Sequence, residues 1–302
     1  MSEEVKQNIV EQESVAVDNT PQIPALPQKG NFPAMFDMVA MLLIVVVVQT
    51  VVSFVCVLLG VPMPEMLGGE IGDVEQYIGQ QVVRGQGYAI IYPISMIIAY
   101  LFILLYTRLR DGKGRIARVS TRGFNPNIIL AGLIWIVAAQ IVVEPLMALF
   151  PTIDQDAGQG FWAIVTSVIF APVFEELIFR GAILEALLRR YGRLVSVIVS
   201  SLLFAVVHFQ PEVMVAAFVT GFILGTVYLH TSSIFSTIIL HSINNAIAYS
   251  LITLDLDNYS YSKIFGGDSF YYIIYAVAFV ICVIATVDTW RRRKPKGVIS
   301  AK

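Results

Sequence analysis

The sequence contains few charged residues, few cysteines and few histidines. Only 14% of the 302 residues are charged and 57% are hydrophobic, whereas a soluble domain carries roughly 25% charged residues. The two cysteines, Cys56 and Cys282, lie in apolar runs and provide neither a zinc knuckle nor a disulfide framework. No basic stripe or aromatic-basic platform indicates a nucleic-acid partner. These scarcities exclude a large soluble domain and indicate a polytopic membrane protein.

Eight apolar segments follow one another along the chain, and a membrane-spanning helix needs about 20 such residues. They cover residues 34–60, 88–107, 127–150, 161–188, 194–209, 212–229, 234–252 and 270–290. The fifth and sixth segments are short and meet at Pro211, which ends one helix or starts the next. We therefore expect an all-α bundle of about eight transmembrane helices in a lipid bilayer.

Both chain ends are predicted to lie in the cytoplasm. Residues 1–31 are polar and acidic, with three prolines, which predicts a disordered tail. Basic residues cluster after the second, fourth and eighth segments, and the positive-inside rule places such clusters on the cytoplasmic side. They are Arg108, Arg110, Lys113, Arg115, Arg118, Arg122, Arg189, Arg190, Arg193, Arg291, Arg292, Arg293 and Lys294. The expected location is the cell membrane.

Three charged residues stand in the middle of the fourth apolar segment: Glu175, Glu176 and Arg180. One charge at the centre of a bilayer costs at least about 2.5–3.5 kcal/mol, so such residues usually have a partner and a function. Glu176 and Arg180 are four residues apart and are predicted to pair on one helix face. Glu175 points about 100° away from Glu176 and needs a partner from another helix.

Two of the three histidines also lie in or beside apolar runs. His208 ends the run SLLFAVVH, and His241 lies within STIILHSINNAIAY with Asn245 one helical turn further on. His230 stands at the end of a segment, where an interfacial role is ordinary. We expect Glu175, His208 and His241 to converge in one pocket.

Such a set supports two kinds of chemistry. A carboxylate in an apolar cavity can act as general base on water, while histidine and amide groups donate to a developing oxyanion. Alternatively, Glu175, His208 and His241 hold one divalent ion, zinc first, with an open coordination position. The sequence has no H-E-x-x-H motif and no nucleophile elbow, which argues against a zincin and against a covalent serine mechanism. These residues alone leave the two alternatives open.

Three motifs lie in order on separate apolar segments: Glu175-Glu176-x-x-x-Arg180, Phe204-x-x-x-His208 and His241-x-x-x-Asn245. They resemble the motifs of the CAAX-protease and bacteriocin-processing family, called CPBP or Abi, which includes the Ras-converting CAAX endopeptidase. The resemblance covers about residues 161–250. It implies a catalytic core at 161–252, whereas composition and hydropathy alone predict the tail at 1–31, the transmembrane helices in 34–160, and a last helix with a basic tail at 253–302.

The resemblance also implies roles for these residues. Glu175 would activate water with help from His208, and His241 and Asn245 would stabilise the oxyanion. Glu176 and Arg180 would support them, and Phe204 would line the cavity. Some family members are described as metalloproteases and others as metal-free, so the expected cofactor is either none or one divalent metal.

The predicted function is an intramembrane endopeptidase that acts on a membrane-associated peptide or protein. The alternative is a non-catalytic membrane protein that serves bacteriocin self-immunity or scaffolds a partner. A proton-coupled transporter would show inverted repeats with matching broken helices, and the sequence has no such pair.

Overall fold

The computed structural model describes residues 32–61, 74–111, 121, 123–150, 160–254 and 266–291, and these contain helices and no strands. The predicted disordered tail, residues 1–31, lies outside the described residues. The elements are α2 (Met35–Leu58), α3 (Val74–Asp111), α4 (Pro126–Met147), α5 (Phe161–Ile164), η2 (Val165–Phe170), α6 (Ala171–Glu176), η3 (Leu177–Leu184), α7 (Glu185–Leu188), α8 (Arg193–Val206), α9 (Pro211–Thr231), α10 (Ile234–Thr253) and α12 (Asp268–Arg291). The prediction of an all-α fold is confirmed.

Among the described residues, seven helical stretches are long and apolar enough to cross a membrane. They correspond to all the predicted segments except the fifth. The fifth forms α8, which has only 14 residues, too few for a span of about 20. Helix α3 begins at Val74, well before the predicted segment, because the residues in its first turns are too polar to register as an apolar segment.

Helix α8 is short because the chain turns directly after it. Phe209 adopts a left-handed backbone conformation with φ 57°, which no continuing α-helix allows. Two residues later, Pro211 occupies the first turn of α9, where its missing N–H costs no hydrogen bond. The structure therefore resolves the alternative left by the sequence, because Pro211 starts a helix.

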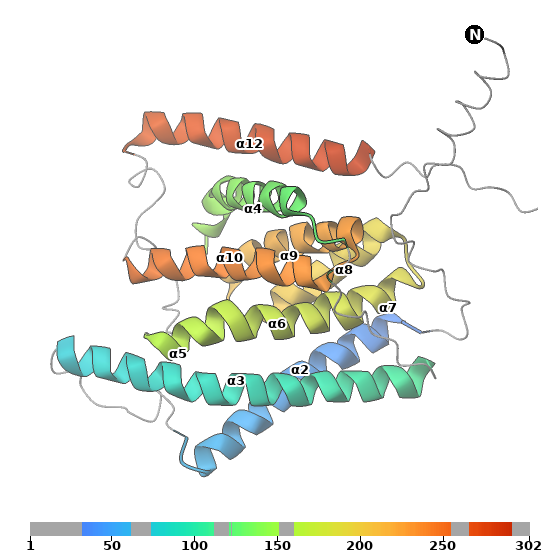
Figure 1. Cartoon of the computed structure of the whole chain (residues 1–302), viewed down its shortest axis with the longest axis vertical. Coiled ribbons are helices and arrows are strands. Elements are labelled where there is room, and N and C mark those ends of the chain that lie inside the picture. The colour runs from blue at the N-terminus through green and yellow to red at the C-terminus, as the bar shows by residue number, and fades with distance from the viewer. Residues whose placement is uncertain are drawn as a thin grey trace, which may run out of the picture.

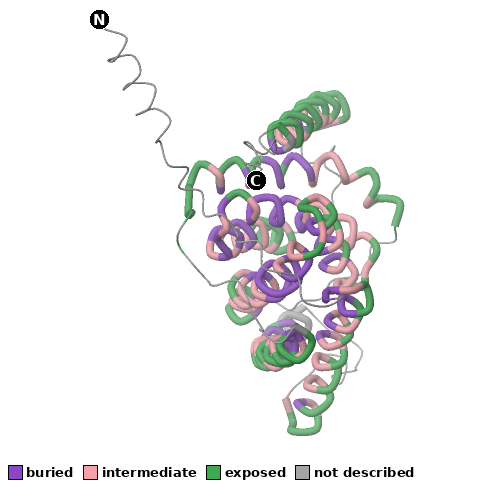
Figure 2. Tube along the Cα trace, turned by 90° about the vertical axis from the view of Figure 1, so that its right-hand side faces the viewer, coloured by how far each residue is buried: buried purple, intermediate pink, exposed green. Residues whose placement is uncertain are grey.

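The long helices run roughly side by side in layers (Figure 1), with α12 at one edge and the α2–α3 pair at the other. Helices α8, α9 and α10 lie between them, together with the segmented helix from α5 to α7. The end-on view shows buried residues gathered in these central elements, while α12 is largely exposed (Figure 2). The core therefore surrounds the segmented helix that carries the charged residues.

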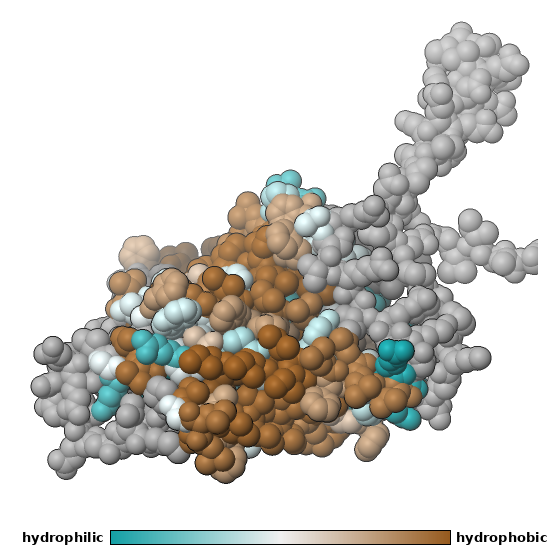
Figure 3. Space-filling view, turned by 60° about the horizontal axis from the view of Figure 1, so that its bottom comes forward, coloured by the Kyte–Doolittle hydropathy of each residue, from teal (hydrophilic) through white to brown (hydrophobic). Residues whose placement is uncertain are grey.

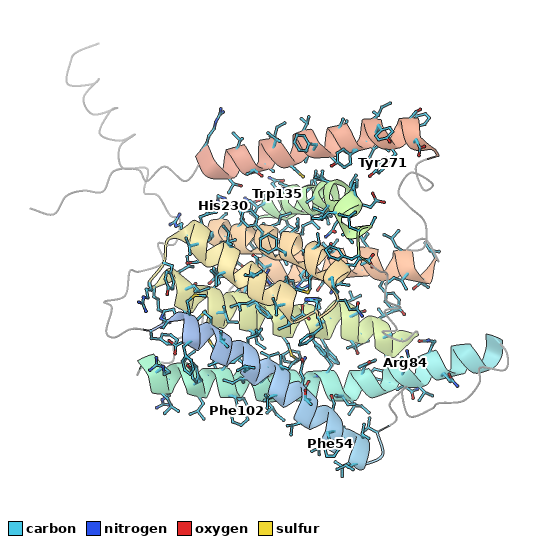
Figure 4. The ribbon with its side chains drawn as sticks, turned by 180° about the vertical axis from the view of Figure 1, so that it is seen from behind. Phe54, Arg84, Phe102, Trp135, His230 and Tyr271 are labelled. Atoms are coloured by element: carbon cyan, nitrogen blue, oxygen red, sulfur yellow. The ribbon has the colours of Figure 1, made fainter. Side chains whose placement is uncertain are left out.

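The outer surface of the bundle is apolar, as a bilayer requires. Hydrophobic side chains cover a broad area of the face shown in Figure 3. Phe54 of α2 is 63% exposed and Phe102 of α3 is 51% exposed, and both point away from the bundle (Figure 4). In water such a surface would be an association site, so its presence supports the membrane prediction.

Helices α8 and α9 approach closely where α9 has glycine. A methyl group at Gly221 would lie 3.0 Å from the Phe204 ring and 3.3 Å from the Ser201 Cα. A methyl group at Gly225 would lie 3.1 Å from Val197. This is the close packing that small residues four apart allow in membranes, and it brings α8 against the backbone of α9.

The last helix is joined to α4 by tyrosines. The Tyr271 hydroxyl donates to Glu144 Oε2 at 2.7 Å, and the Tyr275 hydroxyl donates to the Val142 carbonyl at 3.3 Å. Figure 4 shows Tyr271 on the side of α12 that faces α4. Glu144, for which the sequence suggested no role, therefore has a structural partner.

A buried carboxylate fastens α2 to α3. Asp37 is fully buried and accepts hydrogen bonds from Arg110 Nε and from the Tyr106 hydroxyl, both at 2.7 Å. Its second oxygen caps the helix start by accepting from the Ala34 N–H at 2.7 Å. The N-terminus of α2 is thereby held against the C-terminal turn of α3.

We expect Asp37 and Arg110 to be energetically coupled. Because Arg110 is 44% exposed, the coupling should be weaker than that of a fully buried ion pair. The coupling is measured from the free energies of unfolding of three variants in detergent micelles: Asp37→Asn, Arg110→Gln and the double variant. Additive losses of stability would contradict this assignment.

Candidate active site

The charged residues of the fourth apolar segment lie where its helix changes type. The segment is π-helical over 165–170, α-helical over 171–176 and π-helical again over 177–184. Pro172 occupies the first turn of α6 and cannot donate a backbone hydrogen bond there. Glu175 and Glu176 are the last two residues of α6, and Arg180 lies in η3. π-Helical segments are rare and occur often at functional sites.

Arg180 is buried, with 1% exposure, and both terminal nitrogens of its guanidinium bind protein groups, whereas its Nε has no hydrogen-bond partner. Its Nη1 donates to Glu176 Oε1 at 2.6 Å, and its Nη2 donates to the Gly221 carbonyl at 3.0 Å. The guanidinium carbon lies 4.9 Å from the centre of the Phe204 ring, within the range of a cation–π contact. The predicted Glu176–Arg180 pair is present, and it also joins the segmented helix to α8 and α9.

Glu176 connects this ion pair to a histidine. The same Oε1 atom lies 3.0 Å from His241 Nδ1, and both side chains are buried. Because a carboxylate only accepts hydrogen bonds, Nδ1 carries a proton in this contact. The contact fixes the orientation of the His241 ring and leaves its Nε2 atom to face the neighbouring carboxylate.

That neighbouring carboxylate is Glu175, whose side chain is 14% exposed while that of Glu176 is fully buried. Glu175 Oε1 accepts a hydrogen bond from the Tyr92 hydroxyl of α3 at 2.8 Å. Its Oε2 lies 3.7 Å from His241 Nε2. The prediction that Glu175 meets groups from other helices is therefore correct, although Tyr92 was not among the expected partners.

A cavity of about 200 Å³ opens beside Glu175. Its walls come from α2, α3, the α6–η3 junction and the turn after α8. The lining residues are Val45, Gln49, Tyr92, Met96, Glu175, Phe179, Val207 and His208. An apolar cavity with a few converging polar groups is the usual form of a small binding or catalytic site.

His208 lies on the turn beyond α8 and reaches this cavity. Its Nδ1 is 2.8 Å from the Phe204 carbonyl, which can only accept, so Nδ1 carries a proton. In the neutral ring, Nε2 is then free to accept a proton or a hydrogen bond. The turn thus presents a potential base on the same cavity as Glu175.

Phe204 does not line this cavity, contrary to the expectation from the resemblance. It is 1% exposed and packs edge-on against Phe179, His208 and His241, with ring centres 5.1, 4.9 and 5.7 Å apart. It is buried because its position on α8 faces the close α8–α9 contact. Its ring packs against the rings of both histidines.

The cavity lining includes Glu175 and His208 but neither His241 nor Asn245 of α10, so the expected convergence of Glu175, His208 and His241 in one pocket is met only in part. Asn245 Nδ2 donates to the Ser167 carbonyl in the π-helical segment η2 at 2.9 Å. One of its two amide hydrogens is therefore committed to the backbone, and the second is left for another acceptor. Its predicted catalytic role stays a prediction.

Sequence reasoning did not find Tyr92 and Gln49, two polar residues that α3 and α2 contribute to the cavity lining. Gln49 interrupts the valine-rich run of α2, a signal that could have been used, and its amide lies 3.4 Å from the Met96 sulfur. Tyr92 carries no comparable signal, since tyrosines are common along α3. His230 lies in the last turn of α9, away from the site.

The described side chains do not fit a metal centre. Among them, no group of three His, Cys, Asp or Glu side chains is arranged to hold an ion. The proposed set of Glu175, His208 and His241 therefore does not fit a zinc ion in this arrangement.

We expect Arg180→Met to destabilise the protein by roughly 3–5 kcal/mol, because it leaves the Glu176 charge buried without its cation. The double variant Glu176→Gln/Arg180→Met should recover part of this loss, since it buries no unpaired charge. Denaturant unfolding in micelles measures both variants. A double variant less stable than Arg180→Met would contradict the pairing.

Residues 157–247 match the family of type II CAAX prenyl endopeptidases, described as Rce1-like. The matched segment contains all three motifs and every element from α5 to the middle of α10. It confirms the resemblance to the CAAX-protease family. No curated protein and no solved structure shows a significant match to the chain.

Proposed function

We propose, on the premise of this match to CAAX prenyl endopeptidases, that the protein is an intramembrane endopeptidase. It would hydrolyse a peptide bond of a membrane-associated peptide or protein. The observation that carries the proposal is the Glu175 carboxylate, which opens onto a cavity inside an apolar bundle with two histidines beside it. An ionisable residue at that depth, partnered by other helices, is the arrangement expected of a functional site.

In the proposed reaction, Glu175 Oε2 takes a proton from a water molecule as the water oxygen attacks the peptide carbonyl. His208 Nε2 accepts the second hydrogen bond of this water and holds it in line. The carbonyl becomes a tetrahedral oxyanion. When it collapses, the C–N bond breaks and the proton on Glu175 passes to the leaving amine.

The oxyanion would be stabilised from the α10 side. In its charged form, His241 keeps one proton at Nδ1 on Glu176 and presents the other at Nε2. The uncommitted amide hydrogen of Asn245 is a second donor. Such prearranged donors are worth about 100- to 1,000-fold in rate each. Glu176 thus acts through His241, and Arg180 keeps Glu176 ionised and in place.

The proposed mechanism is metal-free, since no three of the described His, Cys, Asp or Glu side chains are arranged to hold an ion. Water activation by a carboxylate and a histidine needs no Lewis acid when the cavity excludes bulk solvent. Glu175, His208, His241 and Asn245 then each have one role in the reaction.

We propose further that both termini face the cytoplasm. The Arg190 guanidinium donates to the Pro33 carbonyl, and Arg110 pairs with Asp37. The start of α2, the end of α3 and the α7–α8 turn therefore lie at one end of the bundle, and α12 ends on the same side (Figure 1). This is consistent with seven long helices because the short α8 runs into the bundle and α9, which packs along it after the turn at Phe209, runs back. The basic residues at that end of the bundle match the positive-inside rule, and a cell-membrane location follows from it.

Glu175→Gln is expected to lower peptide cleavage by at least about 100-fold, because the amide cannot take a proton from water. The assay uses purified protein in liposomes and a fluorogenic CAAX peptide, with and without a prenyl group on the cysteine. Glu212→Gln, at the start of α9 and away from the cavity, is the matched control. Full cleavage by Glu175→Gln would remove the proposal, and an inactive wild type would favour the non-catalytic alternative.

Exposure to chelators should leave the cleavage rate within about two-fold of the untreated protein, because no step of the mechanism uses a metal. The protein is dialysed against EDTA and 1,10-phenanthroline and its metal content is measured. Activity that falls with metal content and returns when zinc is added would show the metalloprotease mechanism instead.

A further inference from the structure

We infer that Tyr92 of α3 is a positioning residue of the active site and assigns separate tasks to the two oxygens of Glu175. The expected effect on the reaction rate rests on the proposed function. The contact between Tyr92 and Glu175 rests on the geometry alone. Tyr92 lies well before residue 157, where the family match begins. The catalytic site would therefore extend to a helix that the family motifs do not include.

The contact is specific in its atoms. The Tyr92 hydroxyl donates to Glu175 Oε1 at 2.8 Å. Both side chains line the cavity, as does His208. A hydrogen bond to a charged acceptor is about twice as strong as one between neutral groups, so the carboxylate has a firm anchor on this side.

Because Oε1 is held by Tyr92, Oε2 is the oxygen left to react. It lies 3.7 Å from His241 Nε2, beyond hydrogen-bond distance, and is not fixed by that ring. A free carboxylate would rotate about its terminal bond and offer either oxygen. Tyr92 removes this freedom and keeps the reactive oxygen on the side of His241.

The local structure of α3 is suited to hold the ring in place. Helix α3 packs against α6 and η3, which carry Glu175 and Phe179. Pro93 follows Tyr92 within the helix, and the Ser95 hydroxyl donates to the Tyr92 carbonyl at 2.8 Å. The contact between Asp37 and Arg110 joins α3 to α2. Helix α2 in turn contributes Val45 and Gln49 to the lining of the same cavity.

Tyr92→Phe tests the hydroxyl alone, since it keeps the ring. We expect kcat for the CAAX peptide to fall about 10-fold or more while KM stays within about two-fold, as for loss of one hydrogen bond to a charged group. Tyr92→His, which keeps a donor on a ring, should retain more of kcat. Unchanged kcat in Tyr92→Phe, or a rise in KM alone, would overturn the inference.

Tyr100→Phe is the matched control. Tyr100 lies two turns further along α3, is also partly buried and packs against the same core cluster. It takes no part in the cavity lining. Its variant should keep wild-type kcat, and an equal loss in both variants would assign the effect to general destabilisation of α3.

A second measurement needs no activity. The melting temperatures of Tyr92→Phe, Glu175→Ala and the double variant form a cycle, and the two single shifts should sum to more than the shift of the double variant. Additive shifts would overturn the inference. If wild-type protein cleaves neither peptide, the proposed function fails while this cycle still decides whether Tyr92 holds Glu175.

Discussion

The buried charge of Arg180 is the constraint on which the rest of the structure depends. A guanidinium inside an apolar bundle is tolerated only if most of its donors are satisfied and its charge is balanced. Glu176 balances it, the Gly221 carbonyl satisfies a second donor, and the Phe204 ring covers its face. These requirements bring α8 and α9 against the segmented helix, and the Glu176 contact to His241 adds α10. The candidate active site lies beside this junction, where α2 and α3 complete the walls of the cavity.

Adjacent residues with identical side chains therefore have different environments. Glu176 is fully buried, and its carboxylate contacts Arg180 and His241. Glu175 is partly exposed to a cavity and touches groups from α3 and α10. The difference arises from the rotation of about 100° between successive helix positions, since one position faces the bundle core and the other faces a gap between helices. A structural carboxylate and a reactive one can thus stand side by side.

The sequence predicted the parts of this site that depend on local spacing or on the cost of burying polar groups. The Glu176–Arg180 pair follows from a separation of four residues, and the approach of His241 to Glu175 follows from the need of a buried carboxylate for partners. Tyr92 was missed because a tyrosine in an apolar helix costs little and so gives no signal. The interior position of Phe204 depends on the close α8–α9 contact, and the early end of α8 depends on the turn at Phe209. Both are tertiary features that hydropathy does not encode.

The two π-helical segments on either side of α6 set the register of the whole fourth helix. In a π-helix each turn takes up more residues than the 3.6 of an α-helix, so the number of residues in these segments decides which face each later side chain takes. Loss of one residue from 177–184 without a change of winding would turn every later side chain about the helix axis by up to about 100°. Insertions and deletions in this helix would therefore do more damage than most substitutions. The number of residues between Pro172 and Arg189 is as much a part of the fold as their chemical character.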